Sequence, residues 1–112
     1  MRKIERQMIH AINCPGKRWN NTNTKVRWSD DQKYVEVLLH DHIIASINFA
    51  KNRAVISACG YETATTKSRL NAILSDLAPG ARIYAKNFEW FFTYNNKTVE
   101  FSEIDCTAFS LA

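Results

Sequence analysis

The stretch "YVEVLLHDHIIASINFAKNRAVIS", residues 34–57, decides the fold class because its apolar residues recur at every second position. That period is typical of strands with one buried face. We expect the buried face to carry Val35, Val37, Leu39, Ile43, Ala45, Ile47 and Phe49. A tight turn at 50–53, in which Asn52 can take a left-handed conformation, leads to a further strand over 54–59. The stretch therefore predicts a bent antiparallel meander.

Towards the N-terminus, the same period predicts a short strand at 24–28, followed by a turn at 29–32. The polar, asparagine-rich segment 17–24 is typical of a loop. Before it, residues 2–13 are predicted to form a helix that Pro15 and Gly16 end. Its apolar face would consist of Ile4, Met8, Ala11 and Ile12.

Towards the C-terminus, a second helix is predicted over 65–78 and ends before Pro79 and Gly80. Its apolar positions are Leu70, Ile73, Leu74 and Leu77. Thr65 or Thr66 would be the N-cap. Strands are predicted at 82–86, 88–94 and 98–102, with a hairpin turn at 95–97, and the tail 103–112 is apolar enough to pack back on the body.

These elements predict an α+β protein that forms a single domain over residues 1–112. We expect an N-terminal helix, then a strongly bent antiparallel sheet or an SH3-like barrel, with the second helix between strands. Short strands joined by tight turns favour a small, partly open barrel.

The charge and cysteine content restrict the class of protein. The net charge of +4 is compatible with binding a polyanion. The longest apolar runs are too short to cross a membrane, which predicts a cytoplasmic protein. Cys14, Cys59 and Cys106 are an odd number without a CxxC pair, so we expect free thiols in a reducing compartment, with Cys59 as a small core residue.

The segment His40-Asp41-His42 has two interpretations. In an extended strand both imidazoles would point to one face and could bind a metal, but no third ligand stands at a recognised spacing. We favour the alternative, a hairpin turn, and predict no metal and no cofactor. A nucleophile elbow, a glycine-rich phosphate loop and a carboxylate pair are all missing from the sequence, so we expect no enzymatic activity.

Basic residues at the start of the second helix form a candidate anion site. Thr63, Thr65, Thr66, Lys67 and Arg69 would combine hydroxyls, free backbone N–H groups and two cations where a phosphate could bind. The alternative is a capped helix whose basic side chains extend into solvent, since the mismatch with the helix dipole costs only a few tenths of a kcal/mol when screened.

A second candidate site alternates cations with aromatic rings. Strand periodicity would place Lys25 and Arg27 on one face and Val26 and Trp28 on the other. The loop residues Lys17, Arg18 and Trp19 would add two charges and a ring that stacks on a base. The alternative has the rings in the core and the cations outward for solubility.

The run "LLHDHIIASI" (38–47), the motif "GYETATTKSRLN" (60–71) and the strand "FEWFF" (88–92) resemble a family of short uncharacterised proteins of tailed bacteriophages. The motif matches that family's signature, G-[WY]-x-T-x-T-T-[KR]-x-[RH]-[LI]-N, at every position. The resemblance covers residues 34–101 and implies a phage protein without an established activity.

Residues 35–57 also resemble the first motif of Sm-like barrels in their hydrophobic skeleton. The hairpin glycine of that family is replaced by Asp41 or His42, the glycine of its second strand by Ala45, and its second motif is not visible. The resemblance implies a barrel and a homo-oligomer built through open strand edges, without the family's base pocket.

The functional hypothesis is a small non-enzymatic phage-type binding protein that binds RNA or DNA through a basic face, in the cytoplasm of a bacterial host. The alternative is a phage accessory protein that binds a host or phage protein. Its interface would be the strand edges or the apolar helix face around Ile4 and Met8.

Overall fold

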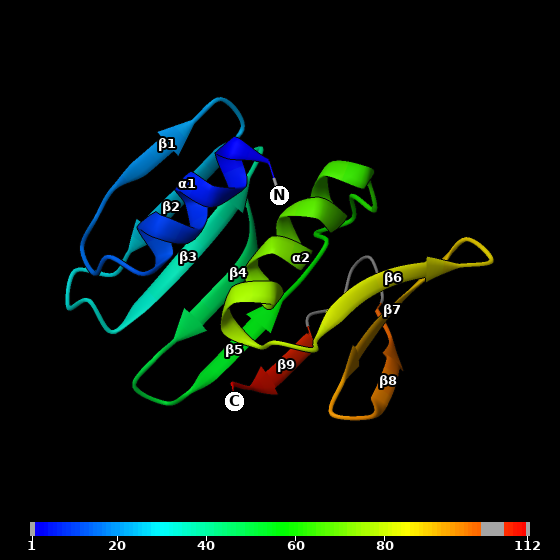
Figure 1. Ribbon diagram of the computed structural model, residues 1–112. Coiled ribbons are helices and arrows are strands. Elements are labelled where there is room, and N and C mark those ends of the chain that lie inside the picture. Colours follow the sequence, from blue (N-terminus) through cyan, green and yellow to red (C-terminus); the bar gives the residue numbers. More distant parts are fainter. Residues whose placement is uncertain (1, 102–106, 112) are drawn as a thin grey trace.

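The structure is a computed structural model that describes residues 2–101 and 107–111. Within these residues the chain forms two helices and nine strands, arranged in two antiparallel sheets (Figure 1). The predicted α+β class is therefore confirmed. No helix in this part of the chain is both long and apolar enough to cross a membrane.

The larger sheet has six strands in the order β1-β2-β3-β4-β5-β9. In chain order they are β1 (Trp19–Asn21), β2 (Thr24–Trp28), β3 (Tyr34–Leu39), β4 (His42–Asn48), β5 (Arg53–Ile56) and β9 (Thr107–Ser110). Consecutive hairpins build the first five strands, and β9 returns from the C-terminal end to pair with β5. The predicted meander and the return of the tail, for residues 107–110, are confirmed.

The smaller sheet consists of β6 (Arg82–Lys86), β7 (Glu89–Tyr94) and β8 (Lys97–Glu100). The helices are α1 (Lys3–Ile12) and α2 (Ala64–Leu77), and α2 lies between β5 and β6 in the chain. Both helices lie against one face of the six-stranded sheet (Figure 1). The smaller sheet lies beside α2 and β9, and its β6–β7 hairpin extends away from the body.

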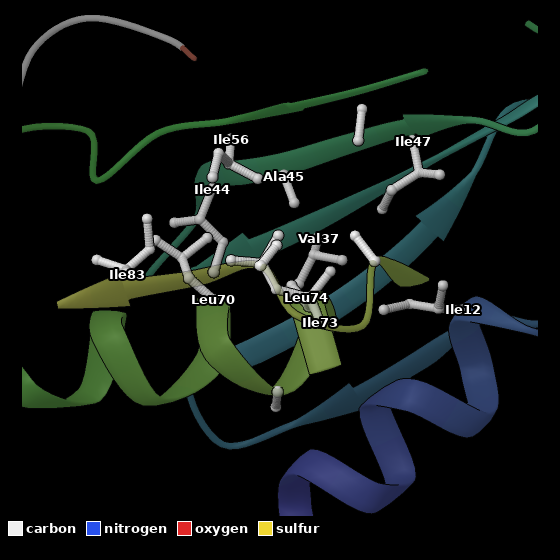
Figure 2. Close-up of a cluster of buried hydrophobic side chains, with 14 of the residues drawn as sticks. Ile12, Val37, Ile44, Ala45, Ile47, Ile56, Leu70, Ile73, Leu74 and Ile83 are labelled. Atoms are coloured by element: carbon white, nitrogen blue, oxygen red, sulfur yellow. The ribbon is translucent and has the colours of Figure 1, made fainter. Parts of the chain in front are cut away.

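The core lies between this sheet face and the two helices. Figure 2 shows Leu70, Ile73 and Leu74 of α2 pointing towards strand residues such as Val37 and Ala45. Ile12 at the end of α1 and Ile83 of β6 extend the same apolar cluster. The apolar spacing predicted for both helices thus serves a single core, in which Met8, Ala11 and Ile12 are fully buried.

A β-bulge in β4 changes which isoleucine enters the core. Val37 pairs with Ala45, whereas the next residue, Leu38, pairs with Ile43, so Ile44 is an extra residue in its strand. Ile44 is consequently 2% exposed and Ile43 is 40% exposed. The prediction of Ile43 on the buried face is wrong because strict alternation does not continue through a bulge. Phe49 lies outside the strand, half exposed, with its ring stacked on Trp28 at 5.9 Å.

The described strands do not close into a barrel. β1 and β9 are the outer strands of the larger sheet and pair only on one side. The barrel prediction is wrong because α1 and α2 cover the face that a barrel would enclose, and their apolar side chains fill it. The predicted loop at 17–24 is also partly wrong, since Trp19–Asn21 forms β1 and pairs with β2.

Two local predictions need correction. The N-cap of α2 is Thr63, whose hydroxyl accepts a hydrogen bond of 3.2 Å from the backbone N–H of Thr66. Neither Thr65 nor Thr66 is therefore the cap. Cys59 lies three residues beyond the end of β5 at a positive φ of 54°, so it is not in a strand, but it is half-buried and packs against the core. Cys106 lies outside the described residues.

Candidate nucleic-acid interface

An open groove of about 860 Å³ lies beside β1 and β2. Four residues of the predicted basic site line it: Arg18, Trp19, Lys25 and Arg27. The β1–β2 hairpin brings them to one edge of the sheet, where Trp19 pairs with Val26 and so lies on its face, whereas Lys25 and Arg27 lie on the other face. The predicted alternation in β2 is confirmed, since Val26 is buried while Lys25 and Arg27 reach solvent.

Two of the cations in the groove carry acidic partners. Lys25 lies 2.7 Å from a carboxylate oxygen of Asp41, and Arg27 lies 2.9 Å from one of Glu36. The hydrogen bond from Lys25 and its positive charge hold the pKa of Asp41 below its ordinary value of 3.8. Both pairs are solvent-exposed, so each contributes little to stability. In each pair, another anion can replace the carboxylate as the partner of the cation.

Arg18 differs from these two residues. In the described part of the chain, its side chain forms no ion pair and no hydrogen bond. It lies next to Trp19, which belongs to a strand and packs partly against the core, so Trp19 is not the loop ring that we predicted. Lys17 lies apart from the groove, in a shallow depression with Arg6 and His10 of α1.

In the structure, Arg69 does not face the predicted anion site at the start of α2. Arg69 is only 3% exposed, and its guanidinium Nη1 lies 2.8 Å from a carboxylate oxygen of Glu5 in α1. Its Nε donates a hydrogen bond to the Thr24 hydroxyl at 3.1 Å. The interpretation of Arg69 as a phosphate ligand is wrong because the side chain points into the protein and already has an anionic partner.

Glu5 is held as a carboxylate by several donors. Burial raises its pKa, but hydrogen bonds from the Ser68 hydroxyl, the Arg69 guanidinium and the Arg2 backbone N–H together lower that pKa below the ordinary 4.5. Glu5 thus joins α1 to α2 and, through Arg69 and Thr24, to β2. The hydrophobic pattern of α1 did not indicate this buried acid.

The other residues at the start of α2 also have structural contacts. The ammonium group of Lys67 lies 5.9 Å from the ring centre of Trp90, a cation–π contact. Thr66 is buried, and its hydroxyl lies 3.0 Å from that of Thr63. Thr65 is half-buried. The five residues of the predicted site therefore do not converge on one exposed point.

His40 and Asp41 form the two-residue turn between β3 and β4, with positive φ values of 50° and 64°. The turn interpretation is confirmed, so His40 and His42 are not neighbours on one face of an extended strand. Among the described residues, no three His, Cys, Asp or Glu side chains come together in a way that could hold a metal ion.

The turn also borders a small pocket of about 260 Å³ at the N-terminal end of α2. His40, His42, Tyr61, Thr63 and Thr66 line it, with Leu39, Ile44 and Ala58 as its apolar part. We did not predict this pocket, because its two sides come from a hairpin and a helix start more than twenty positions apart in the sequence.

A family model described as Kyanoviridae Gp96 protein matches residues 1–108. The chain belongs to this family of phage proteins. The predicted relation to phage proteins is thereby confirmed. The motif at 60–71 remains a prediction as a family signature, and the Sm-like resemblance has no support from the match. No curated protein and no solved structure matches the chain.

Proposed function

We propose that this phage-family protein binds single-stranded nucleic acid, RNA or DNA, in the groove beside β1 and β2. The supporting observation is the convergence of Arg18, Lys25 and Arg27 around one open groove, which Trp19 borders from the edge strand β1. Phosphates bind cations, while an adjacent aromatic ring can stack on a base. The net charge of +4 favours the approach of a polyanion.

The acidic partners of Lys25 and Arg27 fit this proposal. Both ion pairs are exposed, and a pair of this kind is worth at most about 1 kcal/mol. A phosphate can therefore replace Asp41 at Lys25, or Glu36 at Arg27, without a large loss of stability. Arg18 has no ion-pair or hydrogen-bond partner among the described residues, so a phosphate can bind it without displacing one.

Salt-dependent binding tests the groove. We expect a labelled single-stranded oligonucleotide to bind with an affinity that falls as salt rises. The double variant R18Q/K25Q should bind more weakly and show a shallower dependence of log K on log salt, by about 0.7 for each phosphate that no longer meets a cation. The measurement is fluorescence anisotropy over a salt series.

The matched control is K86Q/K97Q, which removes the same charge from exposed positions of the smaller sheet. It should retain the wild-type slope. An equal effect of both double variants would show that only overall charge matters, and no salt-dependent binding of either RNA or DNA would overturn the proposed function.

A protein partner is the second candidate, although most of the predicted helix interface is buried and only Ile4 is partly exposed. The apolar face of α1 is buried against the sheet, so Met8 cannot meet a partner. What favours this candidate instead is the exposure of Tyr34, Ile43 and Val55 on the larger sheet. Self-association through the outer strands β1 and β9 would be its simplest form, and light scattering of the purified protein tests it.

A further inference from the structure

We propose that the pocket between the β3–β4 turn and the start of α2 accepts one unpaired pyrimidine base. The inference rests on the proposed function, because the base would belong to a strand whose backbone lies in the groove. The pocket is defined by His40, His42, Tyr61, Thr63 and Thr66 around an apolar floor. Its volume of about 260 Å³ is below the usual range for drug-sized ligands, which favours a single ring.

The walls offer a surface for stacking. The rings of His42 and Tyr61 have centroids 5.0 Å apart and are tilted by 38°. Tyr61 is about half exposed, so its ring borders the mouth of the pocket instead of filling the core. Leu39, Ile44 and Ala58 are buried at the apolar floor, which suits the faces and edges of a planar ring better than it suits an ion.

The pocket also holds an unused hydrogen-bond donor. The hydroxyls of Thr63 and Thr66 share one hydrogen bond, at 3.0 Å, that consumes only one of their two protons. Whichever hydroxyl donates in this bond, the other can donate a second hydrogen bond to a carbonyl oxygen of a pyrimidine. The ring nitrogens of His40 and His42 have no hydrogen-bond partner among the described residues and can serve the polar edge of the base.

The place of the pocket links it to the groove. Asp41 lines the groove through its pair with Lys25, and its neighbours His40 and His42 line the pocket. Both sites therefore border the same turn, and they lie on opposite faces of the larger sheet, since Leu38 lines the groove and Leu39 lines the pocket. A strand whose phosphate replaces Asp41 at Lys25 can pass around the turn and place a following base in the pocket.

The test compares two strands of equal length and charge, an oligo-dT and an abasic deoxyribose-phosphate strand. We expect the wild-type protein to bind oligo-dT at least about fivefold more tightly, since stacking of even one base has an effect of this size. Y61A and H42A should each weaken the binding of oligo-dT and leave the binding of the abasic strand unchanged. Neither variant should change the salt slope.

Y34A is the matched control, because Tyr34 is an exposed aromatic residue at the opposite end of β3. It should keep the preference for oligo-dT. Circular dichroism checks the fold of each variant, and H42A provides a second test if Y61A does not fold. Equal binding of the two strands by wild type, or an unchanged preference in Y61A and H42A, overturns the pocket while leaving the groove intact. The absence of any binding overturns both.

Discussion

At the scale of single residues, the buried pair of Glu5 and Arg69 has the largest consequences for stability. Both side chains are almost completely buried, and each hydrogen-bonds a further partner, Ser68 for Glu5 and Thr24 for Arg69. A buried pair with good geometry costs desolvation energy, but losing one partner leaves an uncompensated charge in the protein. The arginine of the motif at 60–71 is explained by this contact.

We expect E5Q to lower the free energy of unfolding by about 3 kcal/mol or more, because Arg69 would stay buried without its counter-charge. The double variant E5L/R69M should recover much of that loss, since two apolar side chains can replace the pair. Urea denaturation followed by circular dichroism measures both.

The control is E36Q, which breaks the exposed pair with Arg27 and should cost less than about 1 kcal/mol. A comparable loss in E5Q and E36Q would contradict the role of the buried pair. The pH dependence gives a second readout. The pKa of Glu5 is lowered in the folded state, so its contribution is fully present above the ordinary value of 4.5 and is lost as pH falls through the lower folded pKa. E5L/R69M should lack this part of the acid destabilisation.

At the scale of elements, the β6–β7 hairpin contains a turn that is poorly matched to its sequence. Asn87 and Phe88 connect the strands with positive φ values of 52° and 66°. Asparagine tolerates that conformation, whereas a bulky residue there is strained and glycine is preferred. The side chain of Phe88 is fully exposed, so no burial compensates.

We expect F88G to raise the free energy of unfolding by about 1 kcal/mol, because glycine relieves the strain of the left-handed conformation. N87G should change stability by less than about 0.5 kcal/mol, since asparagine already accepts its φ. Thermal and urea unfolding test both variants. A destabilised F88G would contradict the strain that we assign to this turn.

Prediction of the elements succeeded where the apolar pattern was unambiguous. The strand at 82–86 and the spacing of Leu70, Ile73 and Leu74 are found as expected. The bulge in β4 could not be predicted, because Ile43 and Ile44 are chemically equal and either could enter the core. β1 was missed because a strand of three polar and aromatic residues has no periodicity of its own.

At the scale of the whole molecule, β9 joins the two sheets. It pairs with β5 of the larger sheet. The ring centre of its Phe109 lies 5.1 Å from the ring centre of Phe92 and 5.8 Å from that of Tyr94, both in β7. Asn52 adds a hydrogen bond from its side chain to the Leu111 carbonyl at 2.8 Å. The smaller sheet is thus attached through aromatic packing as well as through its chain connection to α2.

We expect F109A to lower the free energy of unfolding by about 2 kcal/mol, which is less than for a fully buried phenylalanine because the ring is half-buried. Hydrogen exchange should accelerate more in β6–β8 than in β2–β4, since the smaller sheet loses its aromatic contact with β9. V99A on the exposed strand β8 is the control and should change stability by less than about 0.5 kcal/mol. Uniform acceleration in both sheets would contradict the role of Phe109 as a link.

The sequence by itself determined the class of elements, their order and most of the core. Burial of one face of a helix or strand makes apolar residues recur at a fixed spacing, which can be read directly from the sequence. Only the tertiary structure decided what the basic residues do. Arg69 meets Glu5 across 64 positions, and Arg18, Lys25 and Arg27 meet around a groove. Such contacts have no local signal, since the energy of a charge depends on its burial and on partners that only folding brings close.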